Sequence, residues 1–161
     1  MARGDRHLLE AGRHAPEFRL PRLDGGEISL AEIAAEGPAL LAFFKISCPV
    51  CQLTFPFLER IHQTGTLPVY GISQNDAADT RAFAQRYRTT LPMLLDTEDS
   101  GFAVSNAYGI SSVPTMFLIA RDGSIAQVML GWHKQEMTAL GATAGARVIR
   151  PEDRVPEWKA G

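Results

Sequence analysis

The two cysteines of this chain, Cys48 and Cys51, are its only ones and lie three positions apart. An apolar run of strand length, Ala39–Phe44, precedes them, and residues 52–61, which have helical spacing, follow them. The pair therefore falls where a buried strand passes into a helix. Unpaired amide hydrogens and partial positive charge at a helix N-terminus stabilise a thiolate. The pattern predicts a redox pair that alternates between dithiol and disulfide.

Two other interpretations of the cysteine pair are weaker. Tetrahedral zinc needs four ligands, and the chain has no second cysteine pair. Its histidines show no spacing typical of metal ligands; they are His7, His14, His62 and His133. Two buried, inert cysteines are a further alternative, since free cysteine is often a core residue. Pro49 argues against that alternative, because proline is well suited to the first turn of a helix.

A second segment of chemical interest is residues 108–119, where a short helix ends and a strand begins. Pro114 stands at the start of that strand, where its lack of an amide hydrogen is tolerated. Asp122 and Gly123 form the centre of a turn between this strand and the next, and Gly131 ends the second strand. A strand hairpin is therefore expected directly after Pro114.

Taken together, these motifs closely resemble the thioredoxin superfamily. The resemblance rests on Cys-Pro-Val-Cys after an apolar strand, on Ser-Val-Pro-Thr at residues 112–115, and on the strand–Asp-Gly–strand–Gly pattern that follows. Residues 15–30 are similar to the opening of the alkyl hydroperoxide reductase/thiol-specific antioxidant (AhpC/TSA) branch. That branch contains peroxiredoxins and TlpA/ResA-type thiol-disulfide oxidoreductases. The resemblance covers residues 14–145.

The resemblance implies a thiol-disulfide oxidoreductase. Cys48 is the expected attacking thiol, because it lies nearer the exposed end of the helix; it forms a mixed disulfide with the substrate, which Cys51 then resolves. It also implies a cis Val113–Pro114 bond that lies against the cysteines, beside backbone that pairs with a substrate strand. The expected substrate-binding residues are Pro49, Val50, Val113 and Pro114. The expected partners are a protein disulfide and a recycling thiol reductant. No metal and no cofactor are expected.

The sequence departs from these relatives at three positions around the cysteines. Ala42 stands where thioredoxins carry an aspartate, Thr54 where ResA-type proteins carry a glutamate, and Ser47 where a tryptophan is familiar. The buried thiol therefore lacks the usual carboxylate. Lys45 is an electrostatic substitute, because a cation three residues before Cys48 favours its thiolate. The alternative is an exposed lysine at the end of the strand.

Two other functions compete with the oxidoreductase. A peroxiredoxin-like thiol peroxidase is the first, but Lys45 stands where its motif has a threonine, and residues 42–44 contain no proline. Residues 71–74 look as much like peroxiredoxins as like reductases. A non-catalytic binding module that uses only its groove is the second, and the intact cysteine pair argues against it.

The length favours a single domain, and the charge composition argues against nucleic-acid binding. A chain of 161 residues is of single-domain length. It carries 16 Lys and Arg against 18 Asp and Glu, a net charge of −2, and no long basic run. No apolar stretch has membrane-spanning length, and no apolar signal core follows Met1. We expect a cytoplasmic protein if Met1 is the native start, and a periplasmic or extracytoplasmic one if a signal peptide was removed.

Alternating strands and helices, with the resemblance, predict an α/β fold: a thioredoxin-like three-layer arrangement with a central mixed β-sheet, helices on both faces and an N-terminal β-hairpin extension. Strands are expected at residues 18–20, 27–29, 39–45, 67–73, 91–95 and 125–130. Helices are expected at residues 30–35, 49–64, 77–88, 101–108 and 134–146, with Pro56 kinking the second. The predicted divisions are an N-terminal arm at 1–13, a thioredoxin-like domain at 14–147 and an extended C-terminal tail at 148–161, in which Trp158 docks on the body or on a partner.

Overall fold

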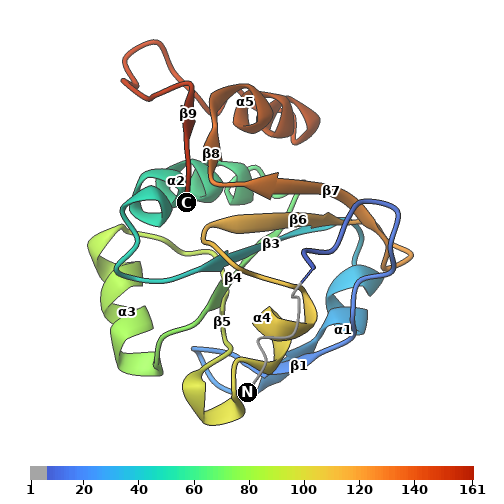
Figure 1. Cartoon of the computed structure of the whole chain (residues 1–161). Coiled ribbons are helices and arrows are strands. Elements are labelled where there is room, and N and C mark those ends of the chain that lie inside the picture. Colours follow the sequence, from blue (N-terminus) through green and yellow to red (C-terminus); the bar gives the residue numbers. More distant parts are fainter. Residues whose placement is uncertain (1–6) are drawn as a thin grey trace.

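A five-stranded mixed sheet organises residues 7–161, the part of the chain that the computed structural model describes (Figure 1). The strand order is β5-β4-β3-β6-β7. β3 (Ala39–Phe44) lies at the centre, and all six of its residues are buried, as expected for a strand covered on both faces. β4 (Val69–Ser73) and β5 (Met93–Leu95) run parallel to β3. On the other side, β6 (Thr115–Ile119) is antiparallel to β3, and β7 (Ile125–Leu130) is antiparallel to β6.

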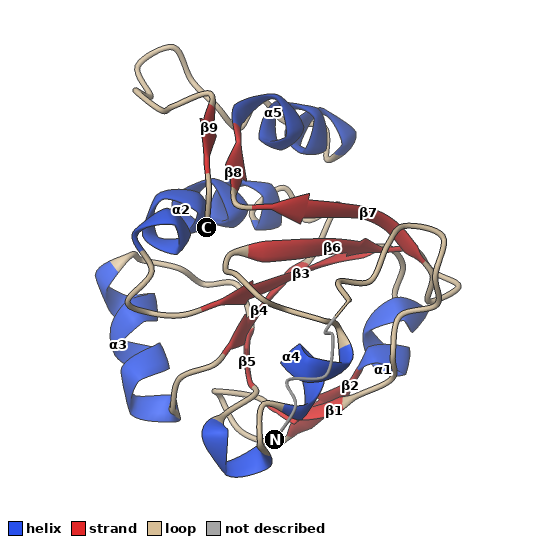
Figure 2. Cartoon of the chain, viewed as in Figure 1, coloured by secondary structure: helices blue, strands red, loops and turns tan. Residues whose placement is uncertain are grey.

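Helices cover both faces of this sheet (Figure 2). Successive side chains of a strand point to opposite faces, so Phe43 and Phe44 mark the two sides. Phe44 packs against Phe55 and Phe83, with ring centroids 4.3 and 5.0 Å apart, whereas Phe43 packs against Tyr108 at 5.3 Å. The helices are α1 (Leu30–Ala35), α2 (Pro49–His62), α3 (Ala77–Arg86), α4 (Ala103–Ala107) and α5 (Lys134–Thr143). The predicted thioredoxin-like layers are therefore confirmed.

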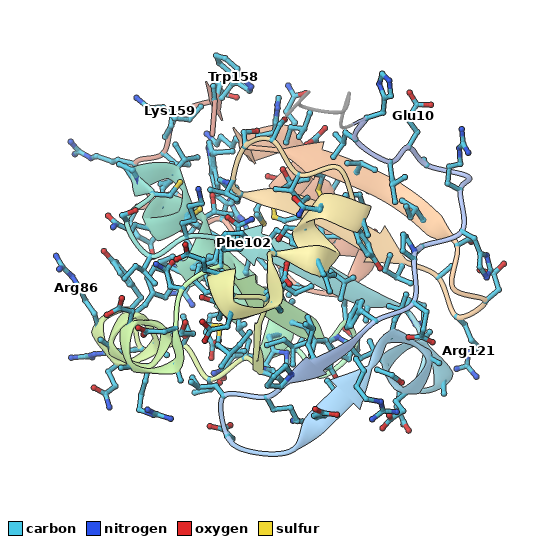
Figure 3. The ribbon with its side chains drawn as sticks, turned by 60° about the horizontal axis from the view of Figure 1, so that its bottom comes forward. Glu10, Arg86, Phe102, Arg121, Trp158 and Lys159 are labelled. Atoms are coloured by element: carbon cyan, nitrogen blue, oxygen red, sulfur yellow. The ribbon has the colours of Figure 1, made fainter. Side chains whose placement is uncertain are left out.

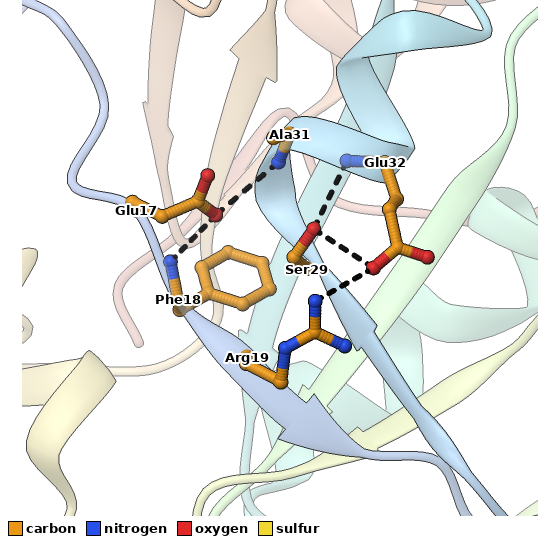
Figure 4. A network of polar contacts seen from close by, with 6 residues as sticks. All are labelled: Glu17, Phe18, Arg19, Ser29, Ala31 and Glu32. Carbon is orange, nitrogen blue, oxygen red and sulfur yellow. Dashed lines mark hydrogen bonds and ion pairs between the residues drawn. The ribbon is translucent and has the colours of Figure 1, made fainter.

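The N-terminal hairpin consists of β1 (Arg19–Pro21) and β2 (Glu27–Ser29), and α1 follows it directly. Ser29 caps α1, because its hydroxyl accepts the amide hydrogen of Glu32 at 3.1 Å and donates to the Glu32 carboxylate. Glu17 adds a second tie by accepting the amide hydrogens of Phe18 and Ala31 (Figure 4). These contacts fix the hairpin extension against the first helix.

Several element ends differ from the sequence prediction by a few residues. The strands expected from residues 67 and 91 begin at Val69 and Met93, each directly after a proline that has no amide hydrogen to donate. The expected helix at 101–108 is reduced to α4, because Gly101 and Phe102 have left-handed backbone conformations. A separate 3₁₀ turn, Glu98–Ser100, precedes it.

Glu59 ties α2 to the chain segment that enters β5. Its residue is only 8% exposed, and its carboxylate accepts the amide hydrogens of Thr90 at 2.8 Å and Leu91 at 3.1 Å. The Thr90 hydroxyl and the Gln63 side chain also donate to it. Burial alone would raise the pKa of Glu59, but these hydrogen bonds outweigh burial and lower it. Glu59 is therefore an ionised anchor between the helix and the edge of the sheet.

The C-terminal segment folds back onto the body. Arg60 of α2 binds the Asp153 carboxylate at 2.6 Å, and the Trp132 indole donates to the Pro156 carbonyl, also at 2.6 Å. β9 (Trp158–Lys159) then pairs antiparallel with β8 (Trp132–His133). The predicted domain boundaries stay predictions, and residues 1–6 of the predicted arm lie outside the described residues. No helix within residues 7–161 combines the length and apolar character needed to cross a membrane.

Candidate active site

Cys48 is the N-cap residue of α2. Its backbone is extended, and its Sγ accepts the amide hydrogen of Cys51 at 3.2 Å. Pro49 occupies the first helical position, as the sequence predicts, because its missing amide hydrogen has no partner there anyway. The two cysteines are thus the N-cap and the third residue of one helix, the spacing at which an N-cap side chain meets a free backbone amide. This geometry places the Cys48 sulfur at the positive end of the helix.

Cys51 differs from Cys48 in exposure. Cys51 is fully buried, whereas Cys48 is partly exposed. Burial raises the pKa of the Cys51 thiol strongly, and the hydrogen bond with Cys48 adds to the rise. Cys51 therefore stays protonated at neutral pH. The pair contains one accessible sulfur and one sheltered sulfur, which suits an attacking and a resolving thiol.

We expect iodoacetamide to modify Cys48 at least about tenfold faster than Cys51 in the reduced folded protein at pH 7, since thiolate character and access control thiol reactivity. Mass spectrometry of peptides from timed samples measures both rates. In denaturant the two rates should converge, which controls for local sequence effects. Equal rates in the folded protein would contradict the assignment of Cys48 as the nucleophile.

The segment around Pro114 lies against the cysteines, as the resemblance implies. The Val113–Pro114 peptide bond is cis. The Cys48 thiol donates to the Val113 carbonyl at 3.3 Å, so the fold joins residues that are 65 positions apart in the chain. Pro49 is exposed, whereas Val50, Val113 and Pro114 are buried. The substrate-binding roles of these four residues stay predictions.

Two polar residues that the sequence analysis did not select hold the loop before Cys48. Asn75, just after β4, accepts the amide hydrogen of Ile46 at 3.0 Å, and Gln52 of α2 donates to the Ile46 carbonyl at 3.0 Å. Ile46 is therefore fixed through both of its backbone groups. The available signal was an asparagine directly after a buried parallel strand, where the ends of neighbouring strands meet.

The positions that depart from related sequences are placed as follows. Ala42 and Thr54 are fully buried, and the Thr54 hydroxyl donates to the Val50 carbonyl at 2.7 Å within the helix. Lys45 is exposed at the end of β3, and its effect on Cys48 stays a prediction. Across residues 7–161, no group of three or more His, Cys, Asp or Glu side chains is arranged to hold a metal ion.

A helix-capping thiol, a buried partner thiol and an adjacent cis-proline segment on this sheet define a thioredoxin-fold protein with a dithiol site. The comparison with known families agrees. The sequence pattern of the AhpC/TSA family matches residues 11–128, and the chain belongs to this family.

Among curated proteins, the chain is 31% identical over 137 residues to the thiol-disulfide oxidoreductase ResA of Halalkalibacterium halodurans, covering 83% of this chain and 76% of that protein. Solved structures share its fold. The thioredoxin domain of a thiol-disulfide oxidoreductase from Bacteroides vulgatus superimposes with a TM-score of 0.70 at 22% identity, covering 77% of this chain and 91% of that one. Peroxidoxin BcpB of Mycobacterium tuberculosis gives 0.68 at 21% identity, covering 88% and 97%. Its identity to the ResA protein over most of the chain, together with the cysteine pair, makes the chain a thiol-disulfide oxidoreductase.

Proposed function

We propose that the chain reduces disulfide bonds in protein substrates through the Cys48–Cys51 dithiol. The observation that carries this proposal is the pairing of a partly exposed sulfur at a helix N-terminus with a buried thiol three residues on. In such a pair the accessible sulfur can attack a substrate disulfide, and the buried thiol can then resolve the mixed disulfide that forms. The resemblance to ResA-type oxidoreductases supports the same chemistry.

The reaction has two exchange steps. The Cys48 thiolate attacks one sulfur of the substrate disulfide, forms a mixed disulfide and releases the other substrate sulfur as a thiolate. Cys51 then loses its proton and attacks Cys48, which releases the second substrate sulfur and leaves a Cys48–Cys51 disulfide. The substrate gains two electrons, and the pair loses two. An external dithiol reductant must reduce the Cys48–Cys51 disulfide, and so return those two electrons, before the next cycle.

Peroxidase activity is the alternative function and is not favoured. The fold does not separate the two activities, since a peroxidoxin shares it. The site does distinguish them, because a peroxiredoxin motif places a threonine hydroxyl where this chain has the exposed Lys45. Around the sulfur of Cys48, the hydrogen-bonding groups are the Cys51 amide and the Val113 carbonyl. The Cys51 amide hydrogen is donated to the sulfur itself, and a backbone carbonyl cannot donate a hydrogen bond to a peroxide oxygen.

Reduction of insulin by the protein with dithiothreitol as reductant should exceed the uncatalysed rate by about a hundredfold or more, because exchange rates depend on thiolate fraction and access. Turbidity from the precipitated insulin chains measures it. Consumption of hydrogen peroxide under the same conditions should stay near the rate of free thiol. Rapid peroxide consumption without insulin reduction would favour the peroxidase instead.

A further inference from the structure

The last residues of the described chain pair with β8 in a separate two-stranded sheet and end close to Val113, beside the cysteine site. The amide of Lys134 donates to the Glu157 carbonyl at 3.0 Å, and β8 pairs Trp132 with Lys159 and His133 with Trp158. Hydrogen-bonded pairs alternate in an antiparallel ladder, so Trp132 and Lys159 form the next bonded pair after Lys134 and Glu157. Residues 157–159 are therefore held in an extended conformation by the backbone of residues 132–134.

This segment reaches the carbonyl group that contacts Cys48. Gly131 directly precedes β8, and its amide donates to the Pro114 carbonyl at 2.9 Å. A Cβ atom at Gly131 would overlap the Lys159 carbonyl oxygen, so the tail backbone crosses this glycine at close range. A Cβ atom at Gly161 would overlap the Val113 carbonyl oxygen and stand 3.3 Å from the Pro114 nitrogen. Gly161, at the end of this segment, thus lies against the Val113 carbonyl, which accepts the hydrogen bond of the Cys48 thiol.

The root and the end of the tail are attached differently. Asp153 and Pro156 are held by Arg60 and by the indole of Trp132, as described above. The residues beyond Pro156 are all exposed, and Trp158 is 58% exposed with its ring at the outer edge of the molecule (Figure 3). Lys134 and Glu157 form only an exposed ion pair at 3.4 Å. The end can therefore detach while its root stays in place, because it buries little apolar surface.

We propose that residues 157–161 occupy the surface on which an extended segment of a protein substrate must lie to present its disulfide to Cys48. The tail supplies the same extended backbone that a substrate strand would supply, on the edge formed by β8 and Val113. A protein disulfide competes with the tail for this edge, whereas a small thiol reagent reaches Cys48 beside it. This inference rests on the proposed function for the identity of the competing partner.

Substitution of Lys159 tests the proposal within the full chain. Lys159→Pro removes the amide hydrogen that pairs with Trp132, whereas Lys159→Ala keeps it and is the matched control. A second variant, deletion of residues 158–161, removes the covering segment and keeps Asp153 and Pro156. Far-UV circular dichroism and a thermal melt confirm that each variant folds.

Two rates are measured for each variant: labelling of Cys48 by a maleimide coupled to polyethylene glycol, and by iodoacetamide. We expect Lys159→Pro and the deletion each to raise the rate of labelling by the bulky maleimide about tenfold, the change expected if the tail covers the site about 90% of the time. The KM for insulin should fall about tenfold for the same reason. Lys159→Ala should behave as the unchanged chain, and iodoacetamide rates should change less than about twofold. Unchanged bulky-reagent rates in both Lys159→Pro and the deletion would overturn the proposal. Absence of insulin reduction in every variant would contradict the proposed function, while the labelling rates would still decide whether the tail covers Cys48.

Discussion

Replacing Cys48 by serine should lower the rate of insulin reduction by roughly a thousandfold or more, because the other thiol, Cys51, is buried. Serine keeps a side-chain oxygen that can accept the Cys51 amide hydrogen, so the helix cap is preserved. The loss would therefore report nucleophilicity rather than folding. Steady-state insulin reduction measures it, and Ser47→Ala is the neighbouring control, since Ser47 is exposed and its side chain has no assigned role.

Replacing Cys51 by serine should have the complementary effect. Cys48 can still attack, but nothing releases the mixed disulfide, so complexes with substrate proteins should accumulate. Non-reducing electrophoresis of the variant incubated with oxidised protein shows them as bands that disappear with dithiothreitol. Greater accumulation in Cys48→Ser than in Cys51→Ser would reverse the assigned roles.

Glu59→Ala should lower the free energy of unfolding by about 2–4 kcal/mol, since it leaves the amides of Thr90 and Leu91 without their acceptor. Denaturant unfolding at pH 7 measures the loss. Glu10→Ala is a suitable control, because Glu10 is exposed at the edge of the molecule (Figure 3). A change below about 0.5 kcal/mol would show that the anchor contributes no more than a surface residue.

The same carboxylate predicts a direction for the pH dependence of stability. The pKa of Glu59 is lowered in the folded protein, so its contribution is fully present above the unfolded pKa of about 4.3 and is lost as pH falls through the folded pKa. Glu59→Gln should therefore be less stable than the unchanged chain at pH 7, and the difference should shrink below about pH 4. A difference that stays constant from pH 7 to pH 3 would contradict an ionised anchor.

Most of the fold could be predicted from the sequence, because local preferences for strand and helix agree with the order of strands and helices in the structure. The continuous apolar run of β3 marked a buried strand, and the helices expected from residues 30, 49 and 134 begin at Leu30, Pro49 and Lys134. Errors fall at element ends. The final helix was expected to reach residue 146 and ends at Thr143, because Gly145 turns the chain with a φ of +79° and the Ala146 amide bonds back to Gly141.

The site was predicted only as far as its motifs extend. Cys48, Cys51 and Pro114 stand in recognisable sequence contexts, and the structure brings them together. Asn75 and Gln52 act on the backbone of Ile46, which any residue would offer in the same way, so the position of Asn75 just after a parallel strand was the one available signal. The position of the tail was equally hidden. Its sequence is rich in proline and charge and indicates an extended chain, but long-range backbone pairing of that chain depends on the rest of the fold.

The cap of α2 uses the same sulfur that changes oxidation state. In the dithiol form, Cys48 Sγ accepts the Cys51 amide hydrogen and so contributes to the stability of the folded chain. A thermodynamic cycle links the folding of the two redox forms to the reduction potential, and about 1.4 kcal/mol of difference in stability corresponds to about 30 mV. Relative to the same pair in the unfolded chain, a dithiol form more stable than the disulfide form makes the protein a stronger oxidant, and a less stable one makes it a stronger reductant. The N-terminus of α2 thereby links the thermal stability of the two redox forms to the reduction potential of the cysteine pair.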